Sequence, residues 1–536
     1  MIPIAKSGHR LVKFGPGVRD EVSSAEFGNK ASGLATMAQM GIPVPPGFSL
    51  SLSICEEYYR KGKTLPDDFS SLLNEGIAFL EKASGSMFGG MRRPLLVSVR
   101  SGAPVSMPGI MDTILNVGLN RETLRGLIFL SGNPRFAWDT YRRFILEFSR
   151  VVFRQDPTPY HQALRTMLDS EGVTEPIELN SGSLKNLAFL YERIFSTGIG
   201  KRFPSNVHEQ LACAAEGVIR SWTHPRAEAF RQLNLVKEAR GTAVTIQMMV
   251  FGNMGARSGA GVAFTRNPWL GTRGLLVDFK FGAQGEDVVS GDQSAASQAE
   301  FARAMPDVFS ALAEIGGRLE FHYRDMQDLE FTVEEGRLYI LQTRSGKRSP
   351  YAALKIAVAL CQEGLISPAD VLWMLRDVNL DTITVQEIKS GDYPVAVGIP
   401  ASAGIATGTI AFSGERAEAV ARQGIPVLLV RETASPDDLP GLSYARGLLT
   451  RRGARTSHAA VVARQMGKIC VVQCEALEID YPRGRCTLSG HDLKEGSVIT
   501  IDGSSGNVYL GTVESTEKCP EELISIVRNW EREQQL

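Results

Sequence analysis

Residues 328–344 read DLEFTVEEGRLYILQTR, and apolar and polar side chains alternate along most of this stretch. Such alternation predicts a β-hairpin, with a three-residue loop at 334–336 whose glycine takes the left-handed conformation. With that loop Asp328 lies opposite Gln342, whereas a shift of one residue would send the polar residues of the second strand to the other face. Four polar side chains are therefore expected on one face: Asp328, Glu330, Gln342 and Arg344.

These four side chains have the chemistry of a site for Mg²⁺ and a polyphosphate. Carboxylate and amide oxygens are hard ligands that suit the metal, and a guanidinium offsets the charge of phosphate. A half-solvated hairpin whose polar residues face water fits the same pattern equally well. The rest of the chain has to decide between the two interpretations.

A second informative stretch is TSHAAVVARQMG, residues 456–467. Thr456 or Ser457 can cap a helix, and Gly467 can end it in the left-handed conformation. His458 would then lie in the first turn, where the helix dipole disfavours a cation and favours an anion such as phosphate. A neutral imidazole that accepts a phosphoryl group becomes an anionic adduct, which this position would stabilise. An ordinary capped helix is the alternative.

Two basic residues stand beside glycine-rich sequence. Arg100 ends a predicted strand and enters the loop of SVRSGAPVSMPG, residues 98–109, whose backbone N–H groups could hold phosphates. This loop lacks the Gly-Lys-Ser/Thr ending of a Walker A motif. Lys30 follows Gly-Asn at the start of a helix predicted over 29–41. Either residue can equally be an ordinary solvated side chain.

Composition excludes several classes of protein. The 536 residues are 43% hydrophobic and 22% charged, as in ordinary globular domains, and they suggest two to four of them. The net charge is −1 without a basic block, so we expect no nucleic-acid partner. We expect no membrane partner, because no apolar run approaches the roughly 20 residues that cross a bilayer. The N-terminus has no apolar signal core, and the seven scattered cysteines favour the reducing cytoplasm.

The secondary-structure signals change several times along the chain. Mixed helices and strands are followed by a helical insertion at about 150–235, and strands return at Thr242. Proline and glycine interrupt any regular pattern over 376–400. We therefore expect four parts: a domain over 1–345, a helical segment and linker over 346–400, a compact α/β domain over 401–512, and a helical tail over 513–536.

Several of these stretches together resemble the pyruvate, phosphate dikinase family of phosphoenolpyruvate-utilising enzymes, over nearly all of residues 12–512. The similar segments are GNKASGLATMAQMGIPVPPGF, SVRSGAPVSMPGIMDTILNVGLN, AVTIQMMVFGNMGARSGAGVAFTRNP, AQGEDVVSG, MQDLEFTVEEGRLYILQTRSGKR, LVRETASPDD and LTRRGARTSHAAVVARQMGK. The resemblance implies a multidomain α/β (α+β) fold. Its first domain would be an ATP-grasp nucleotide-binding domain with a helical insertion, and a swivelling α/β phosphohistidine domain would follow.

The resemblance also implies roles for individual residues. Metal binding would fall to Asp328, Glu330 and Gln342, with Mg²⁺ as the cofactor. ATP and phosphate binding would fall to Lys30, Arg100, Arg143 (from the Arg142-Arg143 pair), Asp278 and Glu286. Arg344 would stabilise the charge that builds on the transferred group.

In the family, the histidine that matches His458 attacks the β-phosphorus of ATP, and AMP leaves. Inorganic phosphate then removes the outer phosphoryl group as pyrophosphate, and the phosphohistidine passes the other to pyruvate. Imidazole suits this role because it is largely neutral near pH 7. The carrier must move between sites, so a flexible connection is expected near residues 376–400.

The sequence departs from the family pattern in two ways. Asp278 stands where glutamate is usual, Gly282 replaces asparagine, and Ala454-Arg455 replaces Gly-Met before the histidine. The family also continues into a (β/α)₈ barrel that binds pyruvate, and a barrel needs roughly 250 residues. We therefore expect a separate barrel protein, or another acceptor, to complete the reaction.

Two alternative functions remain. A non-catalytic, nucleotide-binding regulatory relative would keep the fold without the transfer. An antibiotic phosphotransferase of the rifampin type shares both domains, but it has a substrate domain between them, for which the segment after Arg344 is too short.

Overall fold

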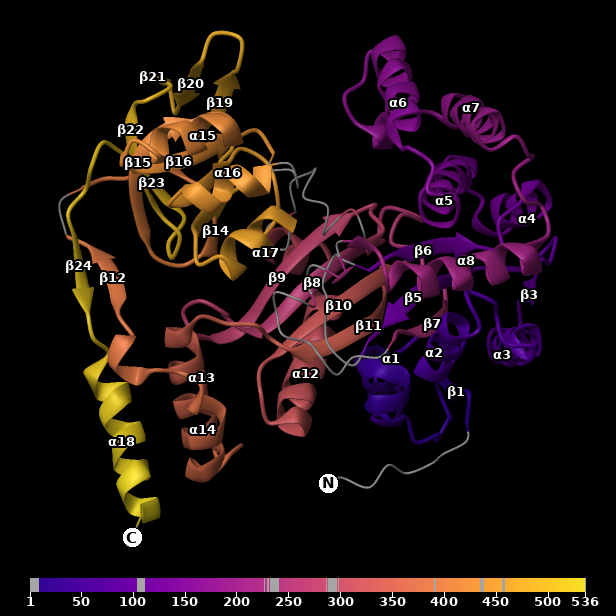
Figure 1. The fold of residues 1–536 in the computed structure, drawn as a ribbon, viewed down its shortest axis with the longest axis horizontal. Coiled ribbons are helices and arrows are strands. Elements are labelled where there is room, and N and C mark those ends of the chain that lie inside the picture. The colour runs from indigo at the N-terminus through magenta and orange to yellow at the C-terminus, as the bar shows by residue number, and fades with distance from the viewer. Residues whose placement is uncertain are drawn as a thin grey trace. The chain divides into compact units, whose positions relative to one another are not determined.

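The computed structural model describes residues 9–103, 111–225, 227–228, 231, 241–285, 287, 296, 298–389, 392–433, 438–455 and 458–535. The chain forms two compact units (Figure 1). Unit 1 consists of Met1–Ala256 with Tyr339–Thr343, and unit 2 consists of Arg257–Leu338 with Arg344–Leu536. The first division falls after Ala256, inside the domain that the sequence predicted to run to residue 345. None of the described helices is long and apolar enough to span a bilayer.

Unit 1 contains a five-stranded antiparallel sheet in the order β1-β2-β7-β5-β6. The strands are β1 (Leu11–Phe14), β2 (Gly47–Leu50), β5 (Val97–Gly102), β6 (Thr113–Val117) and β7 (Ala243–Met248). Three helices accompany it: α1 (Ser24–Gln39), α2 (Leu52–Arg60) and α3 (Phe69–Ser84). Two short strands, β3 (Met87–Phe88) and β4 (Pro94–Leu95), pair with each other.

The helix predicted over 29–41 is the main part of α1. Gly28 interrupts the helix with φ 77°, and Gly41 follows its end with φ 73°. A β-carbon on Gly28 would lie 2.2 Å from the carbonyl oxygen of Gly102, so only glycine permits this close approach of α1 to the end of β5.

A run of helices separates β6 from β7. It consists of α4 (Arg121–Ser131), α5 (Pro134–Phe153), α6 (Thr158–Glu171), the 3₁₀ turn η1 (Pro176–Glu178), α7 (Ser181–Ile199) and α8 (Val207–Ser221). The predicted start at about 150 lies inside α5. Asparagine side chains cap four of these helices by accepting hydrogen bonds from first-turn N–H groups: Asn120, Asn133, Asn180 and Asn206.

Unit 2 begins with strands of a four-stranded sheet in the order β11-β10-β8-β9. The strands are β8 (Gly259–Arg266), β9 (Arg273–Phe281), β10 (Gln327–Glu334) and β11 (Arg337–Ser345). The helices α11 (Gln298–Ala304) and α12 (Pro306–Tyr323) stand between β9 and β10. On one face of the sheet, Phe279 stacks against Phe331 and against Phe301 of α11, with ring centroids 5.8 and 4.2 Å apart.

The hairpin predicted from residues 328–344 is present, but its predicted loop is wrong. Only Glu335 and Gly336 separate the two strands, and both have positive φ, at 48° and 79°. This is the conformation of a two-residue type I′ turn. A glutamate in the left-handed region is uncommon, which is why the three-residue loop, with glycine alone in that region, was the expected solution.

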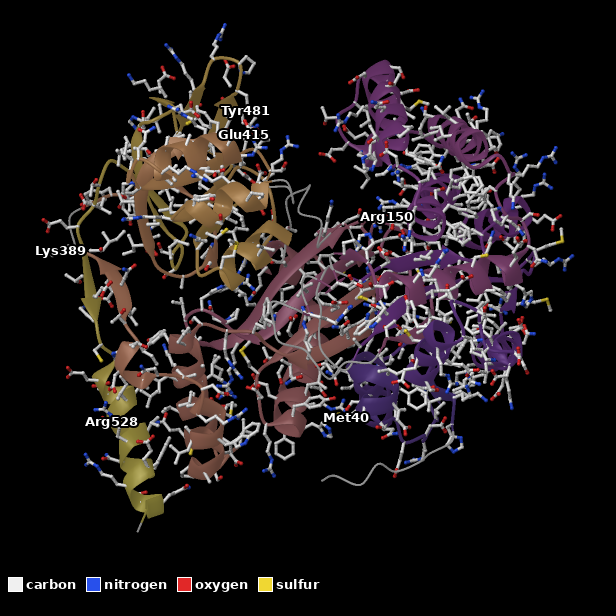
Figure 2. The ribbon with its side chains drawn as sticks, viewed as in Figure 1. Met40, Arg150, Lys389, Glu415, Tyr481 and Arg528 are labelled. Carbon is white, nitrogen blue, oxygen red and sulfur yellow. The ribbon has the colours of Figure 1, made fainter. Side chains whose placement is uncertain are left out.

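The segment predicted as an irregular linker contains regular structure. After α13 (Pro350–Gln362), α14 (Pro368–Leu375) and the 3₁₀ turn η2 (Leu380–Thr382), strand β12 (Val385–Ile388) pairs antiparallel with β24 (Ser515–Lys518). The predicted tail is α18 (Glu521–Gln535), and its Ile524 and Val527 share a core with α13 and α14. Figure 2 shows Lys389, whose Nζ is 2.6 Å from Glu514, at one end of this ribbon and Arg528 on α18.

The remaining part of unit 2 is an α/β fold with an eight-stranded sheet in the order β13-β23-β22-β15-β16-β17-β18-β14. Its strands are β13 (Ala396–Val397), β14 (Ile399–Ser402), β15 (Ile405–Ala411), β16 (Val427–Arg431), β17 (Gly447–Thr450), β18 (Ile469–Val472), β22 (Val498–Asp502) and β23 (Asn507–Leu510). A second sheet consists of β19 (Leu477–Asp480), β20 (Arg485–Leu488) and β21 (His491–Lys494).

The strands β15 to β18 run parallel, and helices connect them. The helices are α15 (Gly414–Ala421), α16 (Leu439–Tyr444) and α17 (His458–Gln465). α17 follows the carboxyl end of β17, the edge at which ligand sites of open α/β sheets occur. The sequence expectation of short strands alternating with helices is therefore confirmed for this part.

Candidate active site

Three carboxylates lie on one face of the sheet in unit 2. Asp278 of β9 and Glu330 of β10 are both direct partners of Val262 in β8, so the three residues share a face. Asp328, two residues before Glu330 on β10, points to the same face because side chains alternate along a strand. We call the side chains of Asp278, Asp328 and Glu330 the carboxylate face.

Arg344 reaches the carboxylate face from the end of β11. Its Nε lies 2.7 Å from Oδ2 of Asp328. The other oxygen of Asp328, Oδ1, is buried and accepts no hydrogen bond from the residues that the structure describes. Of the four polar residues predicted to converge, the structure brings Arg344 and Asp328 into direct contact. The predicted pairing of Asp328 with Gln342 depended on the three-residue loop, which the structure replaces with a two-residue turn.

The electrostatics of Asp328 leave it short of positive charge. Burial raises the pKa of this carboxyl above its ordinary value, Arg344 offsets the rise only in part, and Glu330 adds to it. Burial opposes ionisation of Arg344 as well, but Asp328 and Glu330 together raise its pKa. A further cation beside Asp328 would therefore lower the free energy of the ionised carboxylate.

This deficit fits a divalent metal. A buried carboxylate oxygen without a hydrogen bond, beside a second carboxylate, offers the hard donor set that Mg²⁺ prefers. Within the described ranges no group of three or more His, Cys, Asp or Glu side chains has metal-binding geometry. The predicted third ligand, Gln342, belongs to the segment of β11 in unit 1, and its role stays a prediction.

The predicted phosphate-binding residues of unit 1 lie on separate elements. Lys30 is on α1 and Arg100 on β5, close in sequence to the contact between Gly28 and Gly102. Nη1 of Arg100 donates to the carbonyl oxygen of Leu341, 3.2 Å away and one residue before Gln342. The structure therefore brings Arg100 beside the β11 segment that belongs to unit 1.

The structure separates the roles of Arg142 and Arg143 on α5. Arg142 is buried, with Nη2 2.6 Å from Oδ1 of Asp139. Arg143 is a quarter exposed, and its Nε donates to Oδ2 of the same aspartate at 2.9 Å. Arg143 is thus the member of the pair that can reach a ligand. Sequence reasoning missed Asp139, although its spacing of four residues from Arg143 on a helix is a recognisable signal.

Helix α17 starts at His458, as predicted, and ends as predicted. Gly467 has φ 65°, and the N–H of Lys468 donates to the carbonyl oxygen of Ala463, which closes the helix. The predicted caps Thr456 and Ser457, the side chain of His458, the loop 104–110 and the predicted nucleotide contact Glu286 lie outside the residues that the structure describes.

Two arginines connect α17 and its preceding loop to the first sheet of unit 2. Nε of Arg455 lies 3.1 Å from Oδ1 of Asp278 on the carboxylate face. The guanidinium of Arg464 stacks over Trp269, 5.0 Å from the ring centroid. Sequence reasoning noted Arg455 and Asp278 separately, but it missed Arg464, which has no distinguishing local pattern.

Comparisons with known proteins agree with this architecture. The family described as pyruvate phosphate dikinase, AMP/ATP-binding domain, matches residues 62–306 and 295–363. The family described as PEP-utilising enzyme, mobile domain, matches residues 425–506, which include His458 and α17.

Similar curated proteins come from bacteria and plants. Pyruvate, phosphate dikinase of Clostridium symbiosum is 42% identical over 92% of this chain and 57% of its own length. Pyruvate, phosphate dikinase 1, chloroplastic, of Zea mays is 41% identical over 95% of this chain and 54% of its own length. Pyruvate, phosphate dikinase of Rhizobium meliloti is 42% identical over 91% of this chain and 56% of its own length. This chain thus spans little more than half the length of these relatives. With a matched domain that covers most of its first 363 residues, the chain belongs to the pyruvate, phosphate dikinase family.

Proposed function

We propose that this chain transfers a phosphoryl group from ATP to His458, as a phosphotransferase of the dikinase type. The observation that carries the proposal is the carboxylate face of unit 2. There, Asp328 is buried beside Arg344 with one oxygen that accepts no hydrogen bond from the described part of the chain, and Arg455, three residues before His458, forms an ion pair with Asp278 on the same face. The helix that begins at the histidine is thereby held beside residues suited to a metal and to phosphate.

Each charged group has a place in this proposal. Asp328, Glu330 and Gln342 would hold Mg²⁺, which would supply positive charge to the phosphate oxygens. Arg344 stabilises the charge that develops on the transferred group. Of the five residues predicted to bind ATP and phosphate, four keep that role in the proposal: Lys30, Arg100, Arg143 and Glu286.

The proposed reaction balances in two displacements. A neutral imidazole nitrogen of His458 attacks the β-phosphorus of ATP, a P–N bond forms, and the bond to the oxygen of AMP breaks. Inorganic phosphate then attacks the outer phosphorus, so that pyrophosphate leaves and one phosphoryl group stays on the histidine. The start of α17 would favour this anionic adduct, because the amino-terminal end of a helix carries a partial positive charge.

The finer features of the fold belong to the same proposal. We interpret the nucleotide-binding residues as an ATP-grasp domain and the α/β part around α17 as a swivelling carrier. The paired strands β12 and β24 support the second interpretation, because the carrier's sheet strands lie between these two strands in sequence. A two-stranded ribbon can bend as one element while both of its chains stay paired.

The second transfer, from phosphohistidine to pyruvate or another acceptor, is proposed to take place outside the residues printed here. The greater length of the curated relatives supports this. The acceptor would be bound by a separate barrel protein or by a further domain, and inorganic phosphate would be the second substrate of the first step.

The test is to incubate the purified chain with ATP, Mg²⁺ and phosphate, and to map acid-labile phosphate by mass spectrometry. We expect about one phosphate per chain at His458, none in His458→Ala, and no change in His491→Ala, which removes the exposed histidine of β21. Nucleotide binding without phosphate on His458 would contradict the proposal and favour a regulatory, nucleotide-binding relative.

A further inference from the structure

Asp278 and Arg455, two of the residues at which the sequence departs from the pattern that it resembles, contact each other in the structure. Their side chains form an ion pair, with Nε 3.1 Å from Oδ1, and they are only 5% and 13% exposed. The residues lie 177 positions apart, so nothing in the local sequence of either one predicts the contact.

We propose that Arg455 is a docking and positioning residue, whose ion pair with Asp278 holds the segment before His458 against the carboxylate face. This proposal rests on the proposed function for its catalytic consequence, but the docking itself does not. It also gives Asp278 a different role from the predicted nucleotide contact: Asp278 acts through Arg455.

The segment that carries Arg455 is braced within its own fold. The N–H groups of Arg451 and Arg452 donate to the carbonyl oxygens of Arg431 and Glu432, at 3.0 and 2.8 Å. Both arginines also pair with the carboxylate of Glu432, at 3.1 and 3.3 Å. These contacts stay inside the α/β part, so the backbone before Arg455 is held firmly while Arg455 reaches across to β9.

Arg464 fixes the other side of Arg455. Its Nη2 donates to the carbonyl oxygens of Arg455 and Ala401, at 3.0 and 3.2 Å. The same guanidinium stacks on Trp269, which follows β8. Burial lowers the pKa of Arg464, and Asp328 and Asp278 are among the groups that counteract this effect. Two cations from the α/β part are therefore set against a sheet face that carries three carboxylates.

The electrostatics explain why such a contact would help. A polyphosphate approaching three carboxylates meets repulsion, and each cation added to the face reduces it. Nε of Arg455 makes no hydrogen bond to the described residues, so its contact with Asp278 is electrostatic, and removing either partner would leave a buried charge. The pair thus holds the backbone at Arg455 near β9 and reduces the negative charge that phosphate meets.

The test is a charge swap read in two ways. We would compare the wild type with Arg455→Asp, Asp278→Arg and the double swap, using Arg422→Met as the control, because Arg422 pairs with Glu418 inside the α/β part. The first readout is hydrogen exchange of peptides that cover β9 and residues 447–455. The second is the rate of phosphohistidine formation at saturating ATP.

We expect each single variant to speed exchange at both peptides and to slow phosphorylation about 10-fold, with little change in the KM for ATP. The double swap should restore both readouts to within about 3-fold of the wild type. The control variant should match the wild type in both readouts. Unchanged exchange in the single variants, or a double swap no better than they are, would overturn the docking proposal. If the single variants speed hydrogen exchange as expected but wild-type His458 carries no phosphate, the proposed function would be overturned and the docking proposal would stand.

Discussion

Two buried aspartates in this chain, each paired with arginine, have pKa values shifted in opposite directions. In unit 1, burial alone would raise the pKa of Asp139, but Arg142 and Arg143 together hold it at about 2. In unit 2, burial raises the pKa of Asp328 despite the contact with Arg344, and Glu330 adds to the rise. The difference is the number of cations beside each carboxylate.

The comparison separates a carboxylate whose charge is balanced by two arginines from one that contacts a single arginine. Asp139 has two arginines and serves to hold Arg143 in place. Asp328 contacts one, and in both aspartates Oδ1 accepts no hydrogen bond from the described residues, so the number of cations is the difference between them. A buried carboxylate that is left short of positive charge is expected where a metal ion and a phosphate group supply the remaining interactions.

Arg344 gives the largest expected effect. Arg344→Met should slow phosphohistidine formation about 1,000-fold, because it removes a cation placed beside the transferred group. Quenched-flow sampling of phosphate on His458 would measure the rate. The matched control is Arg348→Met, which removes an arginine paired with Asp325 only four residues later. A loss below about 10-fold would show that Arg344 only compensates Asp328.

Asp328 tests the metal side of the comparison. Asp328→Asn should weaken Mn²⁺ binding about 100-fold in the presence of a non-hydrolysable ATP analogue, as electron paramagnetic resonance would measure. Asp325→Asn is the control, since Asp325 is already paired with Arg348. Unaltered Mn²⁺ affinity would mean that Asp328 resembles Asp139 and that the metal lies elsewhere.

Asp139 gives a smaller effect, and its pH dependence has a defined sign. The folded pKa of about 2 lies below the ordinary value of 3.8, so the carboxylate stabilises the fold above the ordinary pKa and loses this effect as pH falls toward 2. At pH 7, Asp139→Asn should lower the free energy of opening of α5 by about 2 kcal/mol, measured by native-state hydrogen exchange.

The difference between wild type and Asp139→Asn should shrink as the pH is lowered from 4 toward 2. The surface variant Asp169→Asn on α6 should leave α5 unchanged at every pH. A constant difference across this range would show that shape, rather than charge, accounts for the role of Asp139.

Local patterns in the sequence predicted the elements well and their long-range pairings poorly. Alternation was enough to find the hairpin of β10 and β11, and Gly467 was enough to end α17. The hairpin loop was wrong because Glu335 adopts a backbone conformation that the residue type disfavours.

Long-range pairings explain the other differences. Strand β12 is short and borders prolines and glycines, so only its partner β24, about 130 residues later, makes it a strand. In the candidate active site, too, local sequence predicted only the contacts between residues that are close in the chain. Residue types suggested Asp328 and Arg344 as neighbours because a hairpin brings them together, whereas Arg455 and Asp278 meet only through the packing of two sheets.

The most direct test of the central claim uses ATP labelled at one phosphorus at a time. After incubation with phosphate and Mg²⁺, label from the β-phosphorus should remain on His458, and label from the γ-phosphorus should leave as pyrophosphate. Retention of the γ-label on the chain, or no label on His458 from either position, would contradict transfer by the dikinase route.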